Sequence, residues 1–225
     1  MAKGSVAIRM TNDYLFHALF QEDNEALKGF VCALLKLDAG QVKSAVVINP
    51  IELGTSVGDK EFILNPGEGC QRVKPVVHIG LLDFTLFPKF PEFYATHRLM
   101  NVKNHMIYSD KLQLSLVDLT HIDLATEEDM QHRIDCWAAF FKAATWEEIK
   151  MIAQRDENIA KAANTVWKLS QEDKIRLQCE AREDYYRNQR DMEIYMEKQA
   201  GIIAERESLI ACQEGTIARN EETIA

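Results

Sequence analysis

The chain has 225 residues and a net charge of −9, from 26 basic and 35 acidic side chains. This balance excludes a surface broadly dedicated to nucleic acid, although it leaves room for a local basic groove. We expect neither a secretory leader nor a membrane-spanning segment, because no apolar run has the required length. The five cysteines are scattered and form no CxxC pair, which predicts a cytoplasmic protein without disulfides or a thiolate zinc site.

Two helices are predicted near the start of the chain. Thr11-Asn12-Asp13 supplies N-cap chemistry for a helix that continues through Phe20. A second helix is expected over residues 25–37, where large apolar residues recur at helical spacing. Residues 45–48 are rich in β-formers and end at Asn49-Pro50, which predicts a short strand.

Residues 75–87 are the most continuously apolar run and are bounded by prolines, which predicts a buried central strand. A strand that begins at residues 62–64 is cut short by the turn sequence at 65–69. Further strands are predicted at residues 93–100 and 112–119. In the latter, Leu112, Leu114 and Leu116 alternate with Gln113 and Ser115, the pattern of a half-buried strand.

Three helices are predicted to follow these strands. Thr126, with Asp129 three residues later, is expected to begin a helix that runs to about Ala143. The buried face of this helix carries Ile134, Trp137, Phe140 and Phe141. Thr145 begins another helix, and a third is predicted over residues 157–169. Helices on both sides of a small group of strands indicate an α+β or α/β fold.

From residue 171 onward the chain is charged and free of proline, which predicts one long helical tail. Within it, Ile203, Ile210, Ile217 and Ile224 recur every seven residues, each followed by Ala. Three residues after the first three of them stand Arg206, Gln213 and Asn220, where a strong dimeric coiled coil requires Leu. The repeat therefore predicts a weakly self-associating or solvated helix rather than a strong zipper.

Few isolated side chains suggest chemistry. His132 and Cys136 are four residues apart and could share a metal, although packing is the favoured interpretation. His78 is predicted to be a hydrogen-bonded core residue, and His121 with Asp123 to belong to a turn. Asp83 stands out as a carboxylate within an apolar strand, where it would need a partner. The sequence contains no phosphate-binding glycine loop, GxSxG elbow or HExxH motif.

Several segments together resemble the PD-(D/E)XK nuclease-like transposases, the Rpn recombination-promoting nuclease family. The opening TND-x-x-F motif of that family is matched by Thr11, Asn12, Asp13 and Phe16. The resemblance continues through residues 49–52, 74–79, 116–119 and 137–141 and into a charged repetitive tail, so that it covers residues 10 to 200. It implies an α/β restriction-endonuclease-like core, here with an incomplete sheet, followed by a long helical tail.

The resemblance also implies Mg²⁺-dependent cleavage of DNA during recombination. Family members carry an Asp at the end of one strand and Glu-x-Gln or Glu-x-Lys on the next, so that paired carboxylates hold the metal beside the scissile phosphate. In this chain Asn65 stands where the family has Asp, and the Glu-x-Gln strand has no counterpart. Glu52, Glu61 and Glu68 are the nearby acids, and nothing in the sequence arranges them as a replacement site.

These observations favour an internally deleted and inactive member of the family, with a truncated nuclease-like domain at residues 1–170 and the tail at 171–225. No cofactor is expected in this chain. DNA is the partner that the resemblance implies. One alternative is an interaction protein that self-associates through the tail or through the exposed edge of the 75–87 strand. Another is an active nuclease with ligands of an unrecognised kind.

Overall fold

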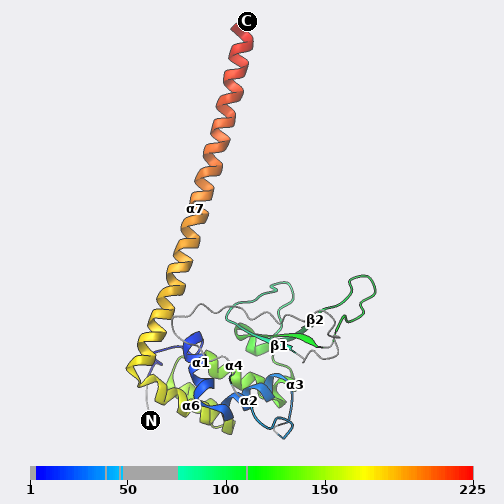
Figure 1. The fold of residues 1–225 in the computed structure, drawn as a ribbon, viewed down its shortest axis with the longest axis vertical. Coiled ribbons are helices and arrows are strands. Elements are labelled where there is room, and N and C mark those ends of the chain that lie inside the picture. Colours follow the sequence, from blue (N-terminus) through cyan, green and yellow to red (C-terminus); the bar gives the residue numbers. More distant parts are fainter. Residues whose placement is uncertain (1–3, 39, 46, 48–75, 110, 225) are drawn as a thin grey trace, which may run out of the picture. The chain divides into compact units, whose positions relative to one another are not determined.

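The computed structural model describes residues 4–38, 40–45, 47, 76–109 and 111–224, with side chains as far as Gly215. It shows an α+β protein with a small, open mixed sheet and a long C-terminal helix (Figure 1). The chain divides into two compact units, Met1–Cys179 and Glu180–Ala225. Within the described ranges, no helix combines the length and apolar character needed to cross a membrane.

The first two helices are α1 (Asp13–Glu22) and α2 (Asn24–Leu34), as predicted from their spacing and caps. The side chain of Asn12 accepts hydrogen bonds from two amides of the first turn of α1, and that of Asp23 accepts one from the Ala26 amide in the first turn of α2. The second helix ends three residues earlier than expected. Lys36 lies in the left-handed region, with φ 54°, so the helix cannot continue through it.

The single helix expected from Thr126 to about Ala143 is wrong, because the structure contains two helices there. Helix α3 (Glu127–Gln131) begins with the predicted capping box, and α4 (Ile134–Lys142) follows after a break. Arg133 has φ 63° and ψ 19°, a left-handed conformation that interrupts the helical path. The buried face predicted for this region is confirmed on α4.

Helices α5 (Trp146–Ala153) and α6 (Glu157–Ser170) follow as predicted. The Thr145 side chain and that of Glu148 form a reciprocal capping box at the start of α5. Where these two helices meet, the rings of Trp146 and Trp167 pack edge to face with their centroids 4.9 Å apart. Such an arrangement is favoured for aromatic pairs and fixes the contact between the helices.

In the described part of the chain three strands form the sheet: β1 (Val76–Leu82), β2 (Tyr94–Arg98) and β3 (Leu112–Asp118). Their order is β1-β3-β2, with β1 parallel and β2 antiparallel to β3. Among the described residues the middle strand is therefore β3, and β1 pairs on one side only. The side chains of β1 are exposed or half-buried, so the prediction that residues 75–87 form a buried central strand is wrong in its burial.

The two faces of β3 differ in burial. Ser115, Val117 and Asp118 are the buried residues of the strand, whereas Leu112 keeps 50% of its surface exposed and Leu114 and Leu116 are half-buried. The face that carries these three leucines, which we call the leucine face, is thus the more exposed one apart from Asp118 at its end. On β1 the register places Ile79 beside Ser115, and Ile79 and Leu81 pack against the core.

Figure 1 shows α1, α2 and α4 gathered on one side of the sheet, where the core lies. Aromatic side chains from these three helices pack together in an aromatic cluster. Its closest ring pairs join Phe16 to Phe20 at 4.8 Å and Phe20 to Phe30 at 5.1 Å. From α4, Trp137 lies 5.3 Å from Phe30, and Phe141 lies 5.4 Å from Phe16. This cluster holds the helix layer together and supports the inner face of the sheet.

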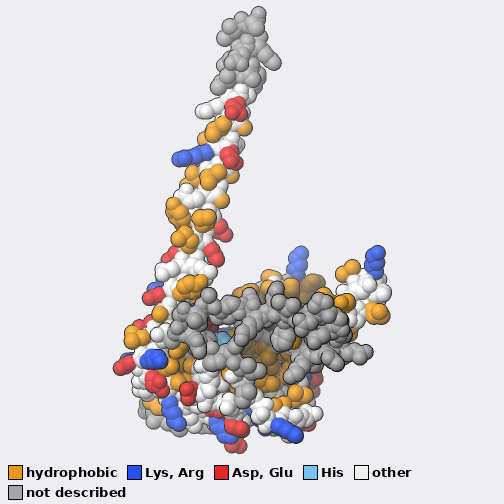
Figure 2. Space-filling view, viewed as in Figure 1, with side chains coloured by type: hydrophobic (Ala, Val, Ile, Leu, Met, Phe, Trp, Pro, Cys, Tyr) orange, Lys and Arg blue, Asp and Glu red, His pale blue; other side chains and the backbone are white. Residues whose placement is uncertain are grey.

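The long helix predicted for the tail is confirmed as α7 (Asp173–Ile224). Its first turns belong to the larger unit, since Ile175 is 8% exposed and Cys179 is fully buried. From Glu180 to Gly215 the side chains are exposed, apart from Gln199, which is partly covered. Figure 2 shows apolar side chains along this exposed helix, although nothing in the described chain packs against them.

Candidate functional site

The acidic positions that the sequence offers for catalysis lie outside the described residues. This applies to Asn65, which the resemblance places where the family has Asp, and to Glu52, Glu61 and Glu68. The structure does describe the TND-x-x-F segment at the start of α1. The site is therefore built from that segment and from the strand ends that face it.

Asn12 has a structural role in which both ends of its side-chain amide take part. Its Oδ1 atom accepts hydrogen bonds from the amides of Tyr14 at 3.1 Å and Leu15 at 3.3 Å. Its Nδ2 atom donates to the backbone oxygen of Cys179 at 3.1 Å, in a buried position. The asparagine therefore joins the start of α1 to the first turns of α7, and its amide is committed to the fold.

Phe16 is likewise a packing residue, because its ring belongs to the aromatic cluster. The two remaining members of the segment, Thr11 and Asp13, line a hollow between α1, α2 and the inner face of β1. The volume of this hollow is about 560 Å³. Most of its wall is apolar, and His17 and Asp83 complete its polar part. Thus Asp13 and Asp83, which are distant in sequence, face one cavity.

The parallel pairing of β1 and β3 explains why polar groups gather at this end of the sheet. Leu82 is level with Asp118, so the carboxyl ends of both strands meet at one edge. Asp83 follows β1 directly and is exposed, which corrects the expectation of a carboxylate inside an apolar strand. Its exposure removes the need for a buried partner.

Asp118 is the buried carboxylate of this edge, with 6% of its surface exposed. Its Oδ1 atom accepts hydrogen bonds from the Thr120 amide at 2.8 Å and the Thr120 hydroxyl at 2.5 Å. Burial alone raises the pKa of Asp118, but these bonds, a further one from Thr85 and the nearby His121 outweigh it and hold the pKa below its ordinary value. The carboxylate is ionised and fixed in the turn that follows β3.

A second hollow of about 360 Å³ adjoins the first and shares Thr11 and Asp83 with it. Arg9 and Lys142 contribute the cationic side chains of its wall. Thr120 also lines it and therefore connects it to the Asp118 turn. The two hollows form a strand-end site with mixed charge, in which positive groups could contact an anionic ligand.

The residues described at this site do not make a magnesium centre. In the described ranges, no three His, Cys, Asp or Glu side chains are grouped so that they could hold a metal ion. Asp118 is engaged by Thr120, which leaves Asp13 and Asp83 as the carboxylates that line the hollow. Because Mg²⁺ requires a nearly octahedral set of oxygen ligands at fixed positions, this arrangement does not define one.

The other side chains singled out in the sequence do not form a site. His78 is exposed on β1, so the prediction of a core histidine is wrong. His132 caps the end of α3 while Cys136 lies within α4, and the break at Arg133 removes the helical spacing that a shared metal would need. Cys136 is buried, and this burial raises the pKa of its thiol.

His121 and Asp123 lie in the short 3-10 helix η2 (Leu119–Leu124), in agreement with the turn role predicted for them. The sequence interpretation missed Arg9, His17 and Lys142, which line the strand-end site, and Asp118, whose hydrogen-bond partner Thr120 lines it. Asp118 had a detectable signal, since it is an acid at the end of an apolar strand. The two cations gave none, because single basic residues near helix ends are common.

A further polar contact that the sequence did not indicate lies at the opposite end of α2. Lys36 Nζ is 2.7 Å from Glu128 and 3.4 Å from the buried Asp129. The same ammonium lies 5.2 Å from the centre of the Tyr94 ring. Burial lowers the pKa of Lys36, but the two carboxylates outweigh this and raise it overall. The lysine joins α2, α3 and β2, which is a structural function.

Taken together, the mixed sheet, the helix layer on its inner face and the polar strand ends define an α+β domain with a polar site at the ends of its strands. A model of the PD-(D/E)XK nuclease family transposases matches residues 64–198, which is more than half of the chain. The chain belongs to this family. Comparison with curated proteins and with solved structures finds no match. The matched residues begin at Leu64, so the resemblance at residues 11–16 and 49–52 remains a prediction.

Proposed function

We propose that this chain is a catalytically inactive member of its family that retains weak binding to DNA. Residues 1–170 would be a truncated nuclease-like domain and residues 171–225 an appended tail. The observation that carries the proposal is the composition of the strand-end site. Its described carboxylates are too few to hold a divalent metal, and the family match begins at Leu64, immediately before the Asn65 that replaces the expected Asp.

Loss of cleavage follows from the chemistry of the metal. In this class of reaction, a divalent cation held by carboxylates activates water and neutralises charge at the phosphate. Asn65 brings a neutral oxygen where the family has a charged one, and neutral ligands bind hard cations less tightly. Without a second carboxylate at a fixed position, the metal and the scissile phosphate are not aligned.

The test is a nicking assay on supercoiled plasmid with purified full-length protein and Mg²⁺ or Mn²⁺. We expect no relaxed or linear product beyond that formed by a mock preparation. Contaminating nuclease is recognised by a matched variant, because Asn65→Ala and Glu68→Ala would leave its activity unchanged. Metal-dependent nicking that disappears in either variant would contradict the proposal and favour an active nuclease with ligands of a new kind.

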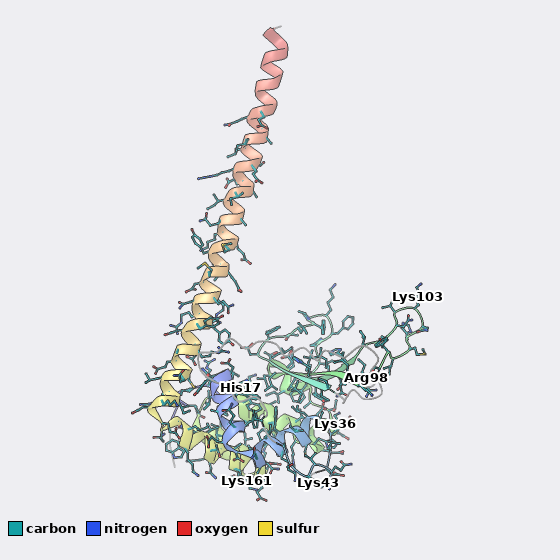
Figure 3. The ribbon with its side chains drawn as sticks, in the orientation of Figure 1. His17, Lys36, Lys43, Arg98, Lys103 and Lys161 are labelled. Atoms are coloured by element: carbon teal, nitrogen blue, oxygen red, sulfur yellow. The ribbon has the colours of Figure 1, made fainter. Side chains whose placement is uncertain are left out.

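DNA binding is supported by local basic residues on an otherwise acidic protein. Arg98 ends β2 and Lys103 lies in the exposed loop that follows it (Figure 3). Contacts from such residues to phosphates release counterions, so the affinity should fall steeply with salt. We expect Arg98→Glu combined with Lys103→Glu to weaken binding of a fluorescent duplex by roughly tenfold at low salt. Lys161→Glu, on α6, is the control and should change the affinity for the duplex little.

A second candidate function is self-association through the tail. It is favoured by the exposed apolar side chains of α7, since a helix in water is stabilised mainly by packing of such a face. Sedimentation of the full chain should show mass that increases with concentration, and truncation after Gln199 should abolish this increase. If the truncated chain associates as strongly as the full one, the open edge of β1 becomes the contact instead.

A further inference from the structure

The exposed part of α7 carries a largely apolar face, which we call the tail stripe. Most of its members recur seven residues apart, and each keeps between 43% and 61% of its surface exposed. They are Tyr185, Met192, Tyr195, Met196, Ile202, Ile203, Leu209 and Ile210. In a helix these spacings place all of them on one side. The stripe is therefore long enough to seat a second helix along several turns.

Three polar residues lie within the stripe at intervals of seven. Gln199, Arg206 and Gln213 continue the series begun by Tyr185 and Met192. Polar residues at such central positions select the register and orientation of paired helices. A partner helix must therefore place a group that interacts favourably with a guanidinium opposite Arg206, because this side chain would lie in the contact between the helices.

A parallel pair of α7 helices does not meet this requirement. In a parallel, in-register pair, equivalent residues face each other, so Arg206 would face the partner's Arg206. Two like charges at one contact are destabilising. The same repulsion arises in both possible parallel contacts, the one in which Arg206 packs beside Ile202 and the one in which it packs beside Ile203. The flanking positions give no compensation, since Lys198 and Glu205 would face isoleucines.

We propose that two copies of this chain pair through the tail stripe as antiparallel helices, with Gln199 level with the partner's Ile202. This inference rests on the self-association proposed above and adds its orientation and register. In this register Met192 packs against the partner's Leu209, and Arg206 stacks on the partner's Tyr195. A guanidinium over an aromatic ring is a favourable contact. Each of these pairs occurs twice, once on either side of the twofold axis.

The flanks of the stripe are complementary in the same register. On one flank Lys198 faces the partner's Glu205, which gives two ion pairs of opposite charge. On the other flank Met196 faces the partner's Ile203. Moving one helix by seven residues in either direction loses this match. In one direction Lys198 faces the partner's Lys198 and Asp191 faces the partner's Glu205. In the other direction Glu205 faces the partner's Glu205, so both shifts bring like charges together. Charge therefore selects one register among the antiparallel alternatives.

The first test is a charge exchange in the full-length protein, read out by sedimentation equilibrium. Lys198→Glu creates two like-charge pairs, and we expect the dimer dissociation constant to rise roughly tenfold. The double variant Lys198→Glu with Glu205→Lys restores opposite charges and should return to within about threefold of the original value. Glu197→Lys makes the same charge change as Glu205→Lys on the outer face of the helix, so it is the matched control and should have little effect.

The second test measures orientation through a nitroxide attached to Cys212, with Cys70 replaced by Ser. Cys212 is exposed, and Cys32, Cys136 and Cys179 are buried. In the proposed register the two labels are separated by some 23 residues of helix, or about 35 Å at 1.5 Å per residue. In an antiparallel register shifted by seven residues, the distance between the labels would differ by about 10 Å. In a parallel pair the labels would lie within about 20 Å of each other.

Rescue by the double variant together with the long distance would establish the arrangement. A dimer with a short label distance, or equal effects of Glu197→Lys and Glu205→Lys, would overturn the proposed register while leaving self-association standing. A protein that stays monomeric at every concentration would overturn both proposals. The two failures are therefore distinguishable.

Discussion

Asn12 and Cys179 are joined by a buried hydrogen bond of 3.1 Å that spans 167 residues of sequence. The same asparagine caps α1, so one side chain fixes the start of the first helix to the root of the last. This gives the TND-x-x-F segment a physical explanation independent of catalysis. Its asparagine and phenylalanine hold the fold together, while its threonine and aspartate face the hollow at the strand ends.

The first prediction concerns this asparagine. Asn12→Ala removes both the cap and the buried donor, and we expect the free energy of unfolding to fall by about 2–3 kcal/mol. Asn12→Ser retains a capping oxygen, but its side chain is too short to reach Cys179. Its free energy of unfolding should therefore lie between those of the alanine variant and the original protein. Urea denaturation provides the measurement. Equal values for the serine variant and the original protein would show that the long-range bond contributes nothing.

The second prediction tests the assignment of the two faces of β3. Val117 is 1% exposed and Leu112 is 50% exposed on the same strand. We expect Val117→Ala to lower the free energy of unfolding by about 2 kcal/mol, and Leu112→Ala by less than about 1 kcal/mol. Thermal or chemical denaturation of the pair gives the comparison. A larger loss at Leu112 would restore the leucine face as the inner one.

The leucine face should also bind dyes that are specific for apolar surface. Val76 and Leu112 are paired across β1 and β3, and both are about half exposed. Replacing the two with Thr, which favours strands, should reduce dye fluorescence without loss of the fold. Unchanged fluorescence would show that the dye binds another surface. Truncation after Gln199 would then test whether that surface is the tail stripe.

A further prediction follows from the ionisation of Asp118. Because its pKa is lowered in the folded protein, its contribution to stability is present above the unfolded value of about 3.9 and is lost as the pH falls through the folded pKa. Asp118→Asn removes this contribution. The stability difference between the two proteins should therefore be largest near neutral pH and shrink in acid below about pH 3.9. A difference that grows in acid would show that the shift has the opposite sign.

The left-handed residue between α3 and α4 gives the last prediction. Arg133 adopts φ 63°, which costs a residue with a Cβ atom about 1–2 kcal/mol relative to the right-handed region. Glycine avoids this cost but is more flexible when unfolded, so Arg133→Gly should raise the free energy of unfolding by up to about 1 kcal/mol. Arg133→Val should lower it. Chemical denaturation of both variants and of the original protein gives the comparison. A glycine variant less stable than the original would indicate that the arginine side chain itself contributes to stability.

The sequence was sufficient for the helices that carry explicit end signals. Asn12, Thr126 and Thr145 all cap helices as expected, because side-chain capping is a local interaction. The break at Arg133 could not be predicted, since neither glycine nor proline marks it. It depends on how α3 and α4 pack, and such tertiary contacts override local preference.

The sheet was harder to predict for a different reason. Alternation along β3 indicates two faces, but hydrophobicity alone does not reveal that the face with Ser115 and Val117 is the more buried one. Ser115 is tolerated inside because its hydroxyl accepts a hydrogen bond from Gln113 at 3.0 Å. The strand-end site was equally hidden, because the register of β1 against β3 brings Asp83 and Asp118 to one edge only in three dimensions. The acids nominated around Asn65 lie outside the described residues.

The placement of the three tryptophans makes the two compact units spectroscopically separable. Trp137 lies in the aromatic cluster, and Trp146 and Trp167 pack against each other between α5 and α6, so all three belong to the larger unit. Tryptophan emission consequently reports only on the helix layer. Far-UV circular dichroism reports in addition on α7, whose 52 residues form the longest helix described. Transitions that differ between the two signals would show the tail melting on its own, without any engineered label.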